Sequence, residues 1–111
     1  MAETGIPAPD ERTLLITDRI VRFRKPKRVI LFGSRSRGDA RENSDIDLCV
    51  LYEKLEKRNV EVMQDLYFEL FGHMGRPVDL VVYEEADFLS KALRPHSFEA
   101  TIASEGRAIY G

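Results

Sequence analysis

Residues 31–48 read LFGSRSRGDARENSDIDL, and this stretch is the most informative part of the sequence. Its apolar start stops at Gly33, which is typical of a buried strand that ends in a tight turn. A polar loop follows, and then Asp45 and Asp47 open a second apolar run. Because side chains alternate along a strand, both carboxylates are expected on one face. The stretch therefore predicts two strands that bring a glycine turn and two carboxylates to one site.

The glycine turn is a candidate phosphate-binding element. Gly33 lets the backbone approach a ligand closely because it has no Cβ. Ser34 adds a hydroxyl beside backbone N–H groups that can face an anion. Arg35 and Arg37 carry permanent charge and forked donors suited to phosphate oxygens. The turn is not a P-loop, since no Gly-Lys-Ser or Gly-Lys-Thr follows it. The alternative is an ordinary turn flanked by solvated arginines.

The carboxylates favour a divalent metal. Two like charges on one face of a strand repel, whereas a cation between them would stabilise them, and hard oxygen ligands suit Mg²⁺ or Mn²⁺. A third carboxylate, Asp79, interrupts the apolar run 77–83, where burying a lone charge is costly. If this run lies beside the strand of Asp45 and Asp47, three carboxylates converge, which is the composition of a two-metal site. The alternative is that these side chains lie at solvated strand ends.

The remaining pattern predicts an α+β (mixed α/β) fold, a small mixed β-sheet flanked by helices. The expected elements are a helix from about Asp10 to before Pro26, strands at 28–32 and 46–52, a helix at 59–74, a strand at 77–83, a helix at 84–93, a final helix at 97–105 and an edge strand at 108–110. The expected buried faces are Leu14, Thr17 and Val21 with Ile20 on the first helix, and Met63, Leu66, Tyr67, Leu70 and Met74 on the second.

Length and composition limit the class of protein. A chain of 111 residues predicts one domain over 1–111, with 1–9 as a loose leader. A net charge of −2 gives no basic signature, so no direct nucleic-acid partner is expected. No stretch approaches the about 20 apolar residues of a membrane span. The single cysteine, Cys49, is expected to be a buried thiol, and with no signal pattern at the N-terminus the expected location is the cytoplasm.

The motifs of this chain resemble those of the DNA polymerase beta nucleotidyltransferase superfamily. The resemblance rests on Gly33-Ser34, ten residues, Asp45-x-Asp47 and the later strand aspartate Asp79. Within the superfamily the chain is similar to the minimal nucleotidyltransferase domain, known as MNT, over about 29–106. The Gly-Ser to Asp-x-Asp signature is specific when it lies on a strand, a turn and a strand, as expected here.

The resemblance implies a polymerase-beta-like nucleotidyltransferase fold and a role for each matching position. The implied triphosphate contacts are Gly33 and Ser34, with Arg35 and Arg37 of the Gly-Ser-Arg-x-Arg-Gly form of the motif as further phosphate contacts. The implied Mg²⁺ ligands, for two ions, are Asp45, Asp47 and Asp79. Asp79 is also implied to help activate the attacking hydroxyl, and ATP is the implied nucleotide donor.

The resemblance also implies a partner. Larger members use a helical second domain to bind their acceptor, which this chain is expected to replace with a separate protein. Many stand-alone MNT proteins pair with a helical HEPN protein as a toxin–antitoxin system. In such pairs the MNT protein is implied to be the antitoxin, which transfers AMP from ATP to a tyrosine of the toxin.

Two other functions stay open at the level of the sequence. The acceptor could be a small-molecule hydroxyl of the antibiotic type, with a homodimer or a partner chain completing the pocket. Alternatively, the chain could be a binding antitoxin that masks its partner, in which case the helix surfaces matter and the aspartates do not.

Overall fold

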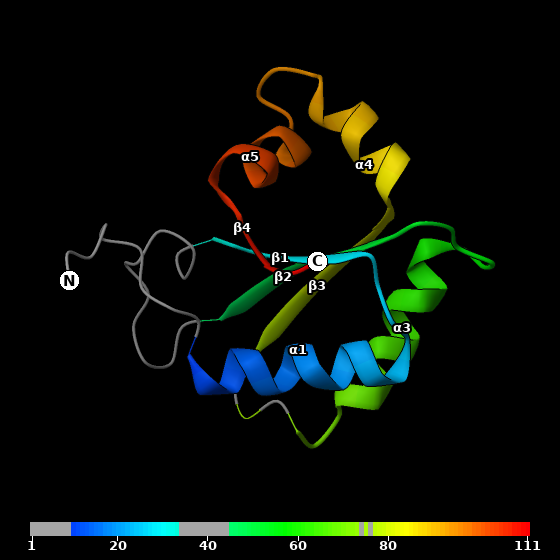
Figure 1. Ribbon diagram of the computed structural model, residues 1–111, viewed down its shortest axis with the longest axis vertical. Helices are drawn as coiled ribbons and strands as arrows, with labels where there is room; N and C mark the ends of the chain where they lie inside the picture. The colour runs from blue at the N-terminus through cyan, green and yellow to red at the C-terminus, as the bar shows by residue number, and fades with distance from the viewer. Residues whose placement is uncertain (1–9, 34–44, 74, 76) are drawn as a thin grey trace.

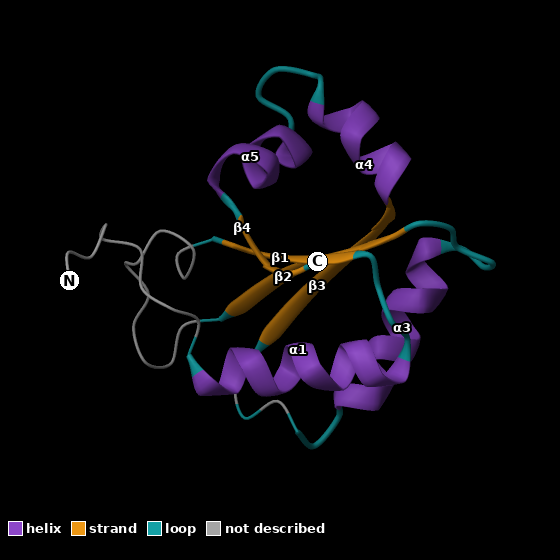
Figure 2. Cartoon of the chain, in the orientation of Figure 1, coloured by secondary structure: helices purple, strands orange, loops and turns teal. Residues whose placement is uncertain are grey.

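The order of helices and strands along the chain follows its short apolar runs. A computed structural model describes residues 10–33, 45–73, 75 and 77–111 (Figures 1 and 2). Its elements are α1 (Glu11–Phe23), β1 (Arg28–Phe32), β2 (Ile46–Tyr52), α3 (Asn59–Leu70), β3 (Val78–Glu84), α4 (Glu85–Ala92), α5 (Phe98–Glu105) and β4 (Arg107–Tyr110). None of the described helices is long and apolar enough to cross a membrane.

Within the described residues, four strands form one mixed sheet in the order β3-β2-β1-β4. β1 pairs antiparallel with both β2 and β4, whereas β2 and β3 run parallel and are joined through α3. Parallel neighbours need such a crossover, because a tight hairpin cannot join them. β1 therefore ends at the side of the sheet where β2 and β3 begin (Figure 1). The predicted α+β fold with a small mixed sheet is confirmed.

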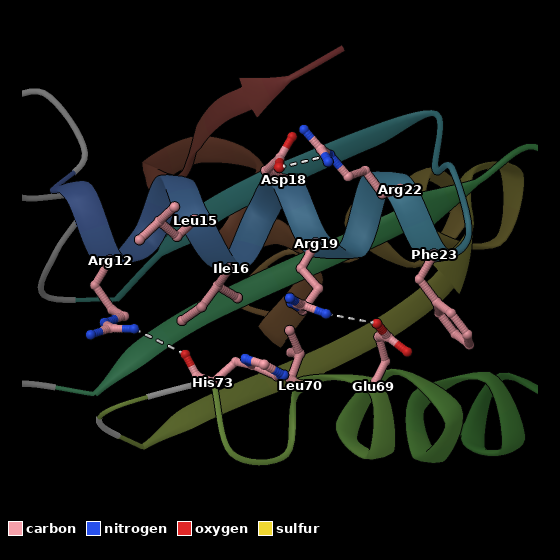
Figure 3. A pocket seen from close by; sticks show the side chains of 10 residues that line it. All are labelled: Arg12, Leu15, Ile16, Asp18, Arg19, Arg22, Phe23, Glu69, Leu70 and His73. Atoms are coloured by element: carbon pink, nitrogen blue, oxygen red, sulfur yellow. Dashed lines mark hydrogen bonds and ion pairs between the residues drawn. The ribbon is translucent and has the colours of Figure 1, made fainter.

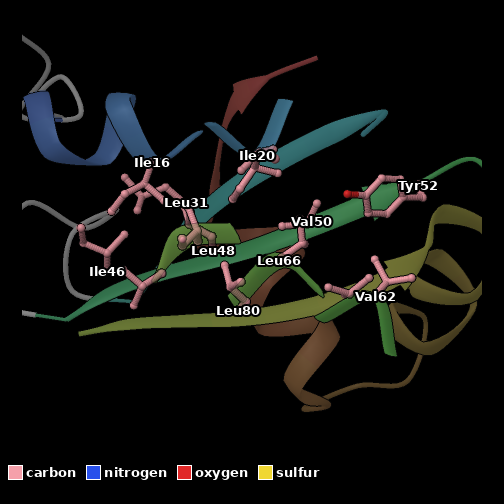
Figure 4. Close-up of a cluster of buried hydrophobic side chains, with 14 residues drawn as sticks. Ile16, Ile20, Leu31, Ile46, Leu48, Val50, Tyr52, Val62, Leu66 and Leu80 are labelled. Atoms are coloured by element: carbon pink, nitrogen blue, oxygen red, sulfur yellow. The ribbon is translucent and has the colours of Figure 1, made fainter. Parts of the chain in front are cut away.

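Helices cover both faces of the sheet (Figures 1 and 2). On one face α1 and α3 pack their buried side chains, such as Ile16 and Leu66, against Leu48 and Val50 of β2 (Figure 4). On the other face Phe88 of α4 and Ile102 of α5 join a second cluster. The cluster's other buried members are Ile30, Cys49, Leu51 and Tyr83. The sheet is therefore the middle layer of three, with α1 and α3 on one face and α4 and α5 on the other.

The buried face of α1 differs from the predicted one. Leu14 is 48 % exposed, so its assignment to the apolar face was wrong. The buried residues of α1 are Thr13, Ile16, Thr17 and Ile20, which follow the i, i+3, i+4, i+7 spacing of one helix face. Burial of the two isoleucines sets the rotation of the helix, and this turns Leu14 to the outside.

The second predicted helix is shorter than expected. α3 ends at Leu70 rather than Met74, because the chain turns at Gly72, whose φ is +83°. The backbone N–H of His73 donates to the carbonyl of Leu70 at 2.9 Å and closes this turn. Of the predicted stripe, Leu66 and Leu70 are buried, Met63 and Tyr67 are partly buried, and Met74 lies outside the described residues.

Candidate active site

The pairing of β2 with β3 brings two of the predicted carboxylates together. Asp47 and Asp79 are direct partners in the parallel register, so their backbones are about 4.8 Å apart, the usual spacing of neighbouring strands. The backbone N–H of Ile46 donates to the carbonyl of Pro77 at 3.0 Å, which ties the starts of the two strands together. Two aspartates 32 positions apart in the chain thus lie side by side.

Alternation along the strands places both carboxylates on the face that α4 and α5 cover. Ile46 and Leu48 belong to the cluster beneath α1 and α3, whereas Cys49 belongs to the cluster beneath α4 and α5. Asp47 shares the face of Cys49, because residues two apart on a strand point the same way. Asp79 likewise shares the face of Val81. Asp47 is half-buried and Asp79 is exposed.

The third element of the site is the glycine that ends β1. Gly33 has φ +75°, in the left-handed region that favours glycine. A Cβ at this position would collide with Oδ2 of Asp47. The residue before it, Phe32, is the register partner of Asp47. Gly33 is predicted from the sequence to let the backbone approach a ligand closely. In the structure it also leaves room for the Asp47 carboxylate.

Of the other predicted site residues, the structure describes Asp45 but not Ser34, Arg35 or Arg37. Asp45 is exposed and immediately precedes the first residue of β2. Ser34, Arg35 and Arg37 lie outside the described residues. Across residues 10–33, 45–73 and 77–111, no three His, Cys, Asp or Glu side chains are gathered as a metal site. The described part of the site is therefore a pair of carboxylates next to a glycine, and the roles assigned to the individual residues stay predictions.

A pair of carboxylates nevertheless fits Mg²⁺. This ion is commonly held by one or two carboxylates together with water and the phosphates of the substrate. The hard oxygen donors of Asp47 and Asp79 match that preference, and the missing side chain at Gly33 leaves room for the Asp47 carboxylate.

The first turn of α5 contacts the end of β1 that lies beside Asp47. The rings of Phe98 and Phe32 meet edge to face, with centroids 5.7 Å apart and an interplanar angle of 82°. One residue further on, Glu99 accepts a hydrogen bond of 2.7 Å from the hydroxyl of Tyr83, which shares the sheet face of Asp79. This hydrogen bond lowers the pKa of Glu99, while burial and the neighbouring Glu99 raise the pKa of Tyr83. Sequence reasoning missed Phe98, because an aromatic residue at a helix start resembles an ordinary core position.

A cavity of about 580 Å³ lies on the opposite side of the sheet, between α1 and α3 (Figure 3). It is lined by apolar residues such as Leu15 and Phe23 and by three arginines. Arg19 pairs with Glu69 at 3.1 Å, and Arg22 pairs with Asp18 at 2.9 Å. Because α1 and α3 cover the face away from Asp47 and Asp79, this cavity is separate from the carboxylate site.

With this geometry the class of protein is defined: the chain is a nucleotidyltransferase domain. Residues 16–111 match the family described as Polymerase beta, Nucleotidyltransferase, and the chain belongs to that family. The resemblance seen in the Gly-Ser and Asp-x-Asp motifs is thereby confirmed.

Two relatives from Methanocaldococcus jannaschii have related sequences. "Putative protein adenylyltransferase MJ1305" is 36 % identical over 70 residues, a match that covers 60 % of this chain and 48 % of the relative. "Putative protein adenylyltransferase MJ0604" is 33 % identical over 84 residues, which covers 76 % of this chain and 78 % of the relative. The chain thus spans about half the length of the first relative and most of the second.

Solved structures of toxin–antitoxin proteins share the fold. A variant of the toxin-antitoxin MntA-HpeT superposes with a TM-score of 0.58 at 24 % identity, covering 94 % of this chain and 74 % of that chain. A toxin-antitoxin with AMP-PNP superposes with a TM-score of 0.54 at 27 % identity, covering 87 % of this chain and 72 % of that chain.

Proposed function

We propose that this protein transfers AMP from ATP to a hydroxyl of a partner protein, with Mg²⁺ as cofactor. The observation that carries the proposal is the register pairing of Asp47 with Asp79 beside Gly33. Two neighbouring carboxylates supply the hard oxygen donors with which proteins hold Mg²⁺ alongside water and substrate phosphates. Family membership and the names of the two relatives support nucleotidyl transfer to a protein.

In this proposal each residue has a separate task. Asp47 and Asp79, together with Asp45, would hold Mg²⁺, and the ion would supply positive charge to the phosphates. The turn at Gly33, continued by Ser34, positions the triphosphate. The acceptor oxygen attacks the α-phosphorus, so that one P–O bond forms while the bond to pyrophosphate breaks. Asp79 accepts the proton that the acceptor hydroxyl loses.

The acceptor in this proposal is a helical toxin of the HEPN type, and the chain is its antitoxin. The support is the likeness to solved toxin–antitoxin structures, one of which contains AMP-PNP. Arg35 and Arg37 add phosphate contacts to the nucleotide site. We place the reaction in the cytoplasm, where ATP is available.

The test uses ATP labelled at the α-phosphate, Mg²⁺ and the protein encoded by the adjacent gene. We expect label on the partner protein with the native chain, and a loss of label of at least about a hundredfold with Asp47→Asn or Asp79→Asn. Both variants should keep the fold, because Asn is close to Asp in size and neither position is fully buried. Asp18→Asn is the control, since Asp18 lies on α1 and pairs with Arg22. Full transfer by both site variants would exclude this site.

A second function, masking of the partner without catalysis, is favoured by exposed apolar side chains. Phe68 is 85 % exposed and Phe71 is 79 % exposed, and both lie on or directly after α3. Large exposed apolar groups often mark protein interfaces. If Asp47→Asn still neutralises the toxin while Phe68→Ser does not, masking rather than transfer would be the antitoxin activity.

A further inference from the structure

We propose that Phe98 is a stacking platform for the base of the nucleotide donor. The inference rests on the proposed function, since it assigns a further part of the same substrate. The ring of Phe98 contacts Phe32, and Phe32 lies opposite Asp47 and directly before Gly33. Only the side chain of Phe32 therefore lies between Phe98 and the two described parts of the site, Asp47 and Gly33.

About half of the Phe98 surface is open to a ligand. In an edge-to-face pair at 82°, each ring covers at most one face of the other. Phe98 remains 52 % exposed, although it is the first residue of a helix that packs on the sheet. An aromatic face of this kind stacks on any nucleobase, because every base has a flat π-surface.

Hydrogen bonds of the neighbouring residues hold the backbone at Phe98. Ser97 caps α5 by accepting a hydrogen bond of 2.9 Å from the N–H of Ala100, and its hydroxyl donates to the carbonyl of Lys91 at 3.0 Å. His96 has φ +67°, an uncommon conformation for a residue other than glycine. On the far side, Glu99 is bound to Tyr83. With the backbone held and the ring in contact with Phe32, stacking of a base needs little reorganisation of this segment.

The position of Phe98 favours a base over an acceptor side chain. The proposed triphosphate lies at Gly33 and the carboxylates, and the base of the same molecule must lie within the span of one nucleotide. Phe98 is the described residue that combines an exposed aromatic ring with a contact to the Gly33 end of β1. The acceptor protein is a separate molecule, so its contacts are not limited to this distance from the triphosphate.

The test compares two probes, ATP and inorganic tripolyphosphate, by calorimetric titration of the full chain with Mg²⁺ present. Phe98→Ala should weaken ATP binding by about 5- to 100-fold, the range expected for loss of one base–aromatic stack. Tripolyphosphate has no base, so its affinity should stay unchanged. Phe98→Tyr should bind ATP as the native chain does, because it keeps the ring.

Two further variants separate stacking from packing. Phe98→Leu keeps an apolar contact with Phe32 without the flat ring, and it should bind ATP as weakly as Phe98→Ala. Leu89→Ala is the matched control, because Leu89 has the same exposed fraction, 52 %, on α4. It should leave ATP affinity unchanged.

The outcomes distinguish this inference from the proposed function. Unchanged ATP affinity in Phe98→Ala, or an equal loss for ATP and tripolyphosphate, would overturn the platform. A loss of transfer with no loss of ATP affinity would assign Phe98 to the acceptor protein and would also overturn it. A native chain that binds ATP but labels no protein would contradict the proposed transfer alone.

Discussion

At the scale of single residues, Gly33 joins two parts of the site. Its positive φ ends β1 with a turn that other residues adopt at a cost. Its missing side chain also leaves the space that the Asp47 carboxylate fills. A substitution at this position therefore has two separable effects, one on the backbone and one on the carboxylate.

We predict that Gly33→Ala lowers nucleotidyl transfer far more than it lowers stability. The backbone cost of an alanine at positive φ is about 1 kcal/mol, whereas the new methyl displaces Asp47. Gly72→Ala is the matched control, because Gly72 also has a positive φ of +83° but a Cβ there would meet nothing within 4 Å. The measurements are the melting temperature and the initial rate of both variants. Equal rates for the two alanine variants would contradict the steric role of Gly33.

At the scale of elements, α5 is fixed to the sheet by contacts at its first turn. Ser97 caps the helix and Phe98 packs on Phe32. The carboxylate of Glu99 accepts a hydrogen bond from the hydroxyl of Tyr83. The Tyr83 hydrogen bond lowers the pKa of Glu99 below its ordinary value of 4.5. A carboxyl with a lowered pKa stabilises the fold above its unfolded pKa, and this contribution disappears as the pH falls through the folded pKa.

We predict that Tyr83→Phe destabilises the protein in a pH-dependent way. At pH 7 the loss should be about 1 kcal/mol, a value reduced for the partial exposure of Glu99, or about 4 °C in melting temperature. As the pH falls through the lowered pKa of Glu99 in the native chain, the difference between the two proteins should shrink, because Glu99 then becomes protonated in both. Tyr52→Phe is the control, since Tyr52 donates to the neutral carbonyl of Arg24 at 2.9 Å. Its loss should not vary with pH in this range.

The elements also show which parts of the structure could be predicted from the sequence. The strands 28–32 and 46–52 were predicted with the observed bounds, because each is a short apolar run bounded by Pro, Gly or charged residues. The burial of Leu14 was predicted wrongly, since the rotation of a helix depends on what it packs against. The sequence predicts the meeting of Asp47 with Asp79 only if their two strands are neighbours. Which strands are neighbours, and in which register, is set by contacts between distant segments. Phe98 could not be singled out for the same reason.

At the scale of the whole molecule, β2 is the centre of the sheet. It has a strand on each side and helices on both faces. Cys49, in the middle of β2, has no exposed surface. Burial, with a smaller contribution from Glu99, raises the pKa of its thiol to about 12. The thiolate, which is the reactive form, is therefore scarce at neutral pH in the folded protein.

We predict that Cys49 reacts with a thiol reagent only when the whole domain unfolds. At pH 8 in the absence of denaturant, labelling should be slower than that of a free thiol by orders of magnitude, since opening of a stable domain is rare. With increasing urea the labelled fraction should follow the unfolding curve measured by circular dichroism. Rapid labelling under native conditions would mean that β2 opens locally, which contradicts a central, fully packed strand.

The register between β2 and β3 also determines on which face of the sheet Asp79 lies. If β3 shifted by one residue, Asp79 would turn to the α1 and α3 face while Asp47 kept its place. Such a chain would hold one carboxylate on each side of the sheet and could not assemble the charge pair. If transfer needs both carboxylates, as proposed, a copy with the shifted register transfers no AMP. Specific activity would then report the fraction of molecules in which β2 and β3 hold the native register.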